Sequence, residues 1–333
     1  MSICARNIAS VAEEVAHGHT LSVKLTEACL QRINMLNSSV NAVVTLSPNS
    51  ERDARRVDCL TSIRDGGLIG LPFSVKDVFK TSGIRTTSSH RALASYVPEV
   101  NATAVDMLTR SGGILIGKTN LPKLASDPQC RSSLFGVTKN PWDLSRTSGG
   151  SSGGSAVAVA LGFSWLDLAS DYAGSIRIPA SFCGVVGFKA TECRIAGDGH
   201  IPPLPGKTST VKHMLSFGFL ARRVEDAGVG LDAMIRHETE KGNLSGEVFD
   251  GLGTQRRQLK FAFWDDFNAI PLCSRTREAL KKIWSNSRRQ ATSLKERGRM
   301  ISISNLYGLH SVPLLEQKVD SFQVEWCALH CPR

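Results

Sequence analysis

The spacing of apolar residues divides the chain into three parts, of which the first 65 residues are typical of helices. Ile8, Val11 and Val15 fall on one face of a helix, and apolar residues recur at a similar spacing from residue 21 to residue 33. A His-Gly-His sequence at positions 17–19 separates these two segments. The elements expected here are helices over residues 8–15, 21–33 and 50–60 and a strand over Val40–Leu46.

Between residues 66 and 205 the pattern changes to short apolar runs separated by glycine and proline. The runs are GLIGLPFSVKDVF, GGILIGKTNLP and GVVGFKA, and a helix-compatible stretch, Ala102–Arg110, lies between the first two. Buried strands that alternate with helices are typical of α/β proteins. This part therefore predicts a central sheet with helices on both faces.

The third part, residues 206–333, carries a weaker pattern. It predicts a helix over Val224–Ile235, a strand over Leu259–Trp264 and an amphipathic helix over Thr276–Lys295, and nothing from Ile301 onward. We treat residues 1–333 as a single domain with an N-terminal helical part (1–65), a core (66–205) and an incomplete or divergent C-terminal part (206–333).

Composition excludes several classes of protein. Hydrophobic residues make up 41% of the 333 residues and charged residues 21%, which is typical of globular proteins rather than disordered chains or coiled coils. The net charge of +10 comes largely from scattered basic pairs without interleaved aromatic residues, so we expect a solvated basic face and no nucleic-acid contact.

The cysteines and the apolar segments indicate where the protein resides. Nine cysteines, an odd number, are widely spread and form no C-x-x-C pair, which is typical of reduced thiols. The N-terminus lacks the apolar core of a secretion signal, and no run approaches the length of a membrane span. We expect a cytoplasmic protein without a membrane segment.

A Gly/Ser run, SGGSSGGS at residues 148–155, has three interpretations: a linker, a phosphate-binding loop or part of a catalytic site. The small apolar residues that follow favour a tightly packed helix over a linker, and no lysine or G-x-G-x-x-G spacing supports phosphate binding. Gly149–Gly153 matches the G-x-S-x-G elbow of α/β-hydrolases, which would make Ser151 the nucleophile. Such an elbow follows a buried strand, whereas NPWDLSRTS is typical of a loop.

A second unusual segment, SDYAGSIRIP, occupies residues 170–179. A small residue and a glycine precede Ser175, which opens a predicted short helix, so that successive backbone N–H groups there are suited to an oxyanion hole. Taken alone, a serine in this position is more often a helix cap than a nucleophile.

Together these segments resemble the amidase signature family, whose hallmark is GGSSGGS followed by D-x-x-G-S-I-R-x-P. The resemblance extends to GLPFSVKD at 70–77, GKTN at 117–120 and CGVVGFK at 183–189, and it is dense from Gly70 to Lys189. It implies a mixed central β-sheet flanked by helices on both faces. It also implies an amidohydrolase that cleaves a carboxamide C–N bond through a serine acyl-enzyme and releases a carboxylate and ammonia or an amine.

The resemblance also implies roles for individual residues. Ser175 is similar to the family's acylated nucleophile, Ser151 to its bridging serine on a cis peptide, and Lys76 to its general base. The backbone N–H groups of four residues would surround the oxyanion: Tyr172, Ala173, Gly174 and Ser175. Four further residues are expected to support the site: Gly150, Ser152, Asp171 and Arg177.

The chemistry explains why a lysine is needed. A serine hydroxyl attacks an amide only when a base accepts its proton, and lysine is a base only when neutral. Lys76 follows the apolar residues 71–75, so burial would lower its pKa. A surface ion pair with Asp77 is the alternative for this lysine. None of the eight histidines belongs to a metal-binding motif, so we expect neither a metal nor a cofactor.

Three functions remain open at this point: a small-molecule amidase, the glutaminase (A) subunit of a tRNA-dependent amidotransferase, and a catalytically idle amidase-like binding module. Members of the family are generally longer and have glycine in place of Ala173. We therefore expect a C-terminally truncated form, and strain at Ala173 if its φ is positive. The expected partner is a small-molecule amide of unidentified structure, and homo-oligomerisation stays open.

Overall fold

The computed structural model describes residues 6–59, 67–207, 213–240, 262–263, 272–293 and 301–302. The described residues fall into two units, 6–240 and 262–302. The single domain predicted over residues 1–333 stays a prediction, and each unit is described by itself.

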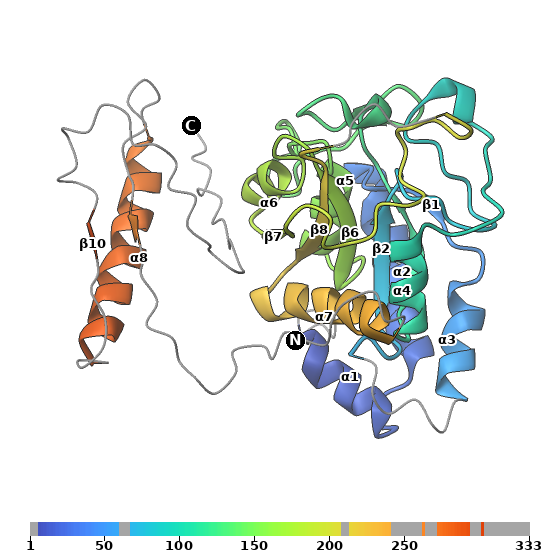
Figure 1. Cartoon of the computed structure of the whole chain (residues 1–333), viewed down its shortest axis with the longest axis horizontal. Coiled ribbons are helices and arrows are strands. Elements are labelled where there is room, and N and C mark those ends of the chain that lie inside the picture. The colour runs from blue at the N-terminus through green and yellow to red at the C-terminus, as the bar shows by residue number, and fades with distance from the viewer. Residues whose placement is uncertain are drawn as a thin grey trace. The chain divides into compact units, whose positions relative to one another are not determined.

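A six-stranded sheet forms the centre of the first unit (Figure 1). Its order is β1-β3-β2-β6-β8-β7, with β2 parallel to β3 and to β6 and the remaining pairs antiparallel. The strands are β1 (Val43–Leu46), β2 (Pro72–Lys76), β3 (Ile114–Thr119), β6 (Leu166–Asp171), β7 (Val186–Lys189) and β8 (Ser216–Ala221). This mixed sheet with its helices confirms the predicted fold class.

The helices and short elements of the first unit connect and cover these strands. The helices are α1 (Ile8–Ala16), α2 (Ser22–Val40), α3 (Ser50–Asp58), α4 (Thr103–Arg110), α5 (Gly153–Ala160), α6 (Arg177–Cys183) and α7 (Val224–Glu240). Shorter elements are the 3-10 turns η2 (Arg91–Leu93) and η3 (Lys123–Ala125) and the hairpin of β4 (Arg131–Ser132) and β5 (Gly136–Val137).

Helices α5 and α7 lie on opposite faces of the sheet. Ser155 of α5 hydrogen-bonds Thr119, 2.8 Å away between their hydroxyl oxygens, and its hydroxyl acts on the carboxyl of Asp167 of β6. Gly230 of α7 packs instead against Leu166, the preceding residue of β6. Because successive side chains of a strand point to opposite faces, the two contacts place the two helices on different sides.

Helix α5 consists of small residues, GGSAVAVA, and residues 153–159 are all buried. A Cβ atom on Gly154 would lie 2.3 Å from the backbone nitrogen of Asn120, and one on Gly153 would lie 2.4 Å from Cβ of Cys130. The helix therefore approaches its neighbours more closely than any larger side chain would permit. This close approach fixes the position of the Gly/Ser run from which the helix begins.

The first predicted strand is too long at its N-terminal end. Helix α2 continues to Val40, and Asn41 ends it in the left-handed conformation with φ of 54°. The Asn37 side chain then accepts hydrogen bonds from the N–H groups of Ala42 and Val43, so that the strand begins only at Val43. A local side-chain cap thus replaces three residues of the predicted strand.

The second unit contains α8 (Ser274–Ser293) and the parallel pair β9 (Ala262–Phe263) and β10 (Ile301–Ser302). Strand β9 lies within the predicted strand over Leu259–Trp264, whose other residues are outside the described ranges, as is the chain from residue 303 onward. Within the described ranges, the six cysteines are free thiols, and no helix combines the length and apolar character needed to cross a membrane.

Candidate active site

Lys76 is the last residue of β2 and is completely buried. Its ammonium nitrogen donates to Oγ of Ser151 at 2.6 Å, and it lies 3.3 Å from Oγ and 3.4 Å from the carbonyl oxygen of Ser170. The alternative of a surface ion pair between Lys76 and Asp77 is therefore excluded. The charged partner of Asp77 is a different lysine, Lys118.

Burial also changes the basicity of Lys76. Loss of water around the ammonium lowers the pKa of Lys76 from 10.5 to about 7, although the charge of Asp171 opposes the shift. A substantial fraction of this amine is then neutral near neutral pH. A neutral lysine at 2.6 Å from a serine hydroxyl is suited to accept its proton.

The Gly/Ser run brings Ser151 to Lys76. The Gly150–Ser151 peptide bond is cis, and Ser151 and Ser152 are fully buried. Gly150 lies against residues 127–129, where a Cβ atom would come within 2.8 Å of the carbonyl carbon of Pro128. Residues 141–148 form turns and one isolated bridge at Thr147, so no strand precedes the run as a hydrolase elbow requires.

Ser175 lies in the turn between the end of β6 and the start of α6 and is partly buried. The N–H group of Ser152 donates to the carbonyl oxygen of Ser175 at 3.1 Å, and the Ser152 hydroxyl is 3.5 Å from the carbonyl oxygen of Ser170. Lys76 and Ser151 are thus in direct contact, and the backbone of Ser152 joins the Ser175 turn to them.

Asp171 and Arg177 brace this turn. The Asp171 carboxylate accepts the N–H groups of Gly174 at 2.7 Å and Ile176 at 3.0 Å, and the Arg177 guanidinium contacts both of its oxygens at 3.0 and 3.1 Å. Burial opposes ionisation of Asp171, but the Arg177 hydrogen bond and the two N–H groups keep its pKa below the ordinary value. The turn is therefore held by a charged pair and not by packing alone.

The residues expected to form the oxyanion hole occupy different environments. Tyr172 and Ala173 are exposed, whereas Gly174 is buried and its N–H group is engaged by Asp171. The positive φ of the turn, 104°, is at Gly174, while Ala173 keeps a negative φ. Alanine at position 173 is therefore unstrained. The oxyanion role of Tyr172, Ala173 and Gly174 stays a prediction.

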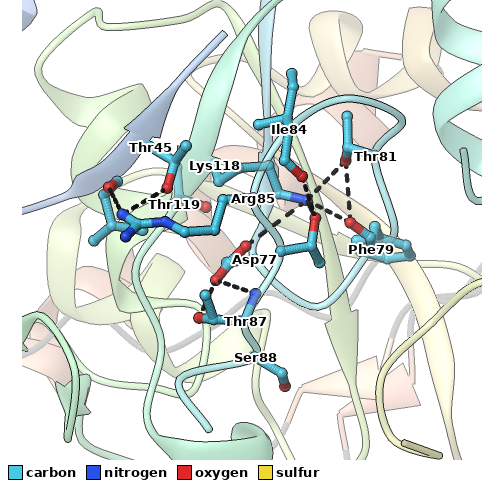
Figure 2. Close-up of polar contacts among 12 residues, drawn as sticks. Thr45, Asp77, Phe79, Thr81, Ile84, Arg85, Thr87, Ser88, Lys118 and Thr119 are labelled. Atoms are coloured by element: carbon cyan, nitrogen blue, oxygen red, sulfur yellow. Dashed lines mark hydrogen bonds and ion pairs between the residues drawn. The ribbon is translucent and has the colours of Figure 1, made fainter. Parts of the chain in front are cut away.

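A second buried lysine, Lys118, lies on β3, the strand paired with β2, and the sequence pattern assigns it no role. Its ammonium donates to the carbonyl oxygen of Phe79, to Oγ1 of Thr81 at 2.7 Å and to Oγ1 of Thr86 at 3.1 Å (Figure 2). It forms an ion pair with Oδ1 of Asp77 at 3.8 Å, with both side chains fully buried. Burial lowers the pKa of Lys118 to about 8.

Strand register separates the two lysines. Lys118 lies opposite Val75, whereas Thr119 lies opposite Lys76. Because neighbouring residues of a strand alternate between faces, Lys118 projects to the face that Lys76 does not use. Lys118 therefore binds the loop that follows β2, and Lys76 faces the Gly/Ser run. The signal for Lys118 in the sequence is its position in GKTN, but its partner lies in another segment, at residue 77.

Comparison with known proteins gives a match between residues 24–296 and the family model described as Amidase. The chain is 39% identical over 234 residues to the (A) subunit of the glutamyl-tRNA(Gln) amidotransferase from Psychrobacter sp. (strain PRwf-1), a match that covers 70% of this chain and 46% of the relative. To the corresponding protein of Oleidesulfovibrio alaskensis it is 35% identical over 291 residues, 84% of this chain and 58% of the relative. The chain thus spans about half the length of these curated relatives.

Solved structures of amidases also align with most of this chain. The peptide amidase from Stenotrophomonas maltophilia aligns with a TM-score of 0.64 at 30% identity, covering 73% of this chain and 51% of that enzyme. A crystal structure of an amidase aligns with a TM-score of 0.70 at 30% identity, covering 91% of this chain and 65% of the other. A fatty acid amide hydrolase, at 22% identity and a TM-score of 0.76 over 90% of this chain and 52% of its own, shares the fold.

Proposed function

Because the chain belongs to the amidase signature family, we propose that it is an amidohydrolase that cleaves a carboxamide C–N bond through an acyl-enzyme on Ser175. The observation that carries the proposal is the 2.6 Å hydrogen bond between the buried Lys76 ammonium and the Ser151 hydroxyl. This contact joins a lysine of lowered pKa to the segment beside Ser175.

Acylation begins with neutral Lys76. It takes a proton from Ser151 as Ser151 takes the proton of Ser175, and the Ser175 oxygen forms a bond to the carbonyl carbon. The carbonyl electron pair moves onto its oxygen, which N–H groups of the 172–175 turn stabilise. As the oxyanion collapses, the C–N bond breaks, and the leaving nitrogen receives a proton from Ser151, which Lys76 replaces.

Deacylation repeats the sequence with water. A water molecule transfers a proton through Ser151 to Lys76 while its oxygen bonds to the acyl carbon, and the ester bond to Ser175 breaks as the proton returns to the serine oxygen. The products are a carboxylate and ammonia or an amine. The proposed reaction uses no group outside the chain apart from the amide and water.

A second candidate function is that of the glutamine-hydrolysing component of a tRNA-dependent amidotransferase. The observation in its favour is the 35–39% identity to two proteins of that kind. Ammonia release from glutamine, together with retention of partner proteins on an affinity-tagged copy of this chain, would support it. Hydrolysis of simple amides by the isolated chain, without ammonia release from glutamine, would support the small-molecule amidase.

The assignment of the nucleophile is tested by labelling with a fluorophosphonate and mapping the adduct by peptide mass spectrometry. We expect the label on Ser175, none on Ser175→Ala, and labelling at least ~100-fold slower for Ser151→Ala and Lys76→Ala. Lys76→Arg should not restore the rate because a guanidinium keeps its proton. Ser126→Ala, at an exposed serine outside the site, is the matched control and should label as the wild type does.

Two outcomes would contradict these roles. An adduct on Ser151 that persists in Ser175→Ala would assign the nucleophile to Ser151, and a normal labelling rate in Lys76→Ala would remove the lysine from the mechanism. A folded wild-type chain that never labels would instead favour the idle binding module.

A further inference from the structure

Asp167 of β6 is a completely buried carboxyl group that the proposed reaction does not use. Its Oδ2 atom accepts hydrogen bonds from the hydroxyl of Ser74 at 2.6 Å and from the hydroxyl of Thr119 at 3.1 Å. Ser155 of α5 hydrogen-bonds Thr119 and its hydroxyl acts on the same carboxyl. One side chain, with Thr119, thus connects the strands β2, β3 and β6 and the helix that begins within the Gly/Ser run.

The second oxygen of this carboxyl, Oδ1, has no hydrogen-bond partner among the described residues although it is buried. An unpartnered buried carboxylate oxygen is costly, because the lost hydration is not replaced. Most buried polar atoms are paired, and those that are not call for an explanation. The two bonds from Ser74 and Thr119 would be satisfied equally well by a neutral side chain, so they do not explain a charged group here.

Strand register places Asp167 on the same face of the sheet as Lys76. Asp167 lies opposite Ser74, and Ser74 and Lys76 are two residues apart on β2. The three side chains therefore face the side of the sheet that α5 covers. The titratable groups that interact electrostatically around Lys76 are Asp167, Lys118 and four further residues: Asp77, Asp171, Cys130 and His200. Helix α5 contributes no titratable residue.

We infer that Asp167 is a positioning residue of the proposed active site, which anchors the strand carrying Lys76 and, by its charge, sets how readily Lys76 holds a proton. The inference rests on the proposed function of Lys76 as the base. A negative charge on the same face of the sheet favours the ammonium over the neutral amine. Asp167 thereby offsets part of the burial that would otherwise leave Lys76 a weak base.

The carboxyl itself titrates near the working range. Burial raises the pKa of Asp167 to about 6, although the hydroxyls of Ser74, Ser155 and Thr119 oppose the shift. Above pH 6 the group is charged and supports the Lys76 ammonium, and below pH 6 this support is lost. Removing the charge should thus move the acidic limb of the pH–rate profile to lower pH, because Lys76 then becomes neutral at lower pH.

The test measures the rate of fluorophosphonate labelling from pH 5 to pH 9. Asp167→Asn should move the midpoint of the acidic limb down by about half a pH unit to one unit and lower the plateau, since a less basic amine accepts a proton less readily. Ser164→Ala is the matched control, because it deletes a hydroxyl 2.8 Å from Ser74 in the same buried network but no charge. Its midpoint should equal that of the wild type.

Thr119→Val is a second variant that keeps the test decisive if Asp167→Asn does not fold. It removes a hydrogen bond to the carboxylate, so the pKa of Asp167 rises and the limb should move in the same direction by a smaller amount. A lowered plateau without a shift of the limb, in each of the two variants that folds, would overturn the inference and leave a structural role. Normal labelling of Lys76→Ala would instead overturn the proposed function, whatever the Asp167 variants do.

Discussion

Replacing Lys118 by methionine should destabilise the fold at neutral pH, because it leaves a buried carboxylate without its counter-charge. The ammonium of Lys118 bonds three oxygens of the loop after β2 and pairs with Asp77, and both charges are fully buried. Methionine fills a similar volume but leaves the Asp77 carboxylate with hydrogen bonds from Thr87 alone, at 2.6 and 3.0 Å. The buried negative charge would then have no counter-charge in contact with it.

The size of the effect follows from the burial of the pair. Removing one partner of a buried ion pair typically costs about 3–5 kcal/mol, which is a large share of the ~5–15 kcal/mol that stabilises a folded domain. Burial also lowers the pKa of Lys118 to about 8, so removal of this ammonium returns up to about 3 kcal/mol below pH 8 and offsets part of the loss. Burial already raises the pKa of Asp77, and removal of Lys118 raises it further. A carboxyl whose pKa is higher in the folded than in the unfolded state destabilises the fold as pH rises above the unfolded value. The loss in Lys118→Met should therefore be larger at pH 7 than at pH 5.

Urea unfolding of the wild type, Lys118→Met, Asp77→Asn and the double variant at pH 5 and pH 7, followed by circular dichroism, checks this reasoning. The double variant removes both charges, so it should be more stable at pH 7 than the sum of the single losses implies. Equal losses in Lys118→Met at pH 5 and pH 7, or strictly additive losses in the double variant, would refute the account of Lys118 and Asp77 as a coupled buried pair.

Two further predictions concern the site itself. Lys76→Met should abolish labelling yet raise the free energy of unfolding at pH 6 by up to about 5 kcal/mol, because an amine whose folded pKa is about 7 destabilises the fold at low pH. This gain in stability should shrink as the pH rises from 7 toward 10.5. An unchanged midpoint of urea unfolding at pH 6 would contradict the prediction. Gly174→Ala should lower the free energy of unfolding by about 1–3 kcal/mol and slow labelling, because φ at this residue is 104°. Ala173→Gly should lower it by less than about 1 kcal/mol and leave labelling normal. Equal effects of the two changes in thermal unfolding would disprove the placement of the strain at Gly174.

Sequence reasoning located β2, β3 and β7 because their apolar runs stand out between glycines and prolines. It also anticipated that burial lowers the pKa of Lys76, since the residues before it are apolar. Strand β6 escaped notice: all six of its residues are buried, but Asp167, Ser170 and Asp171 interrupt its apolar pattern. Hydropathy cannot show that the partners of these polar groups are supplied by other strands and by α5.

The pairing of Lys118 with Asp77 was equally inaccessible from the sequence. It depends on a register shift between Phe73 and Ser74, which brings Lys118 opposite Val75 and sends it to the face of the sheet away from Lys76. It depends as well on the loop over residues 77–88 folding back onto the ammonium (Figure 2). Both are tertiary features, and no local pattern of residues encodes them.

The close packing of α5 decides where the protein can be redesigned. Residues 153–159 have no side facing solvent, and their glycines lie against backbone and side chains that leave no room for a Cβ atom. A mutant library that varies these positions would be dominated by unfolded members. Diversity introduced at the exposed Tyr172 and Ala173, in the turn that carries Ser175, would instead vary the surroundings of the proposed nucleophile while the scaffold is kept.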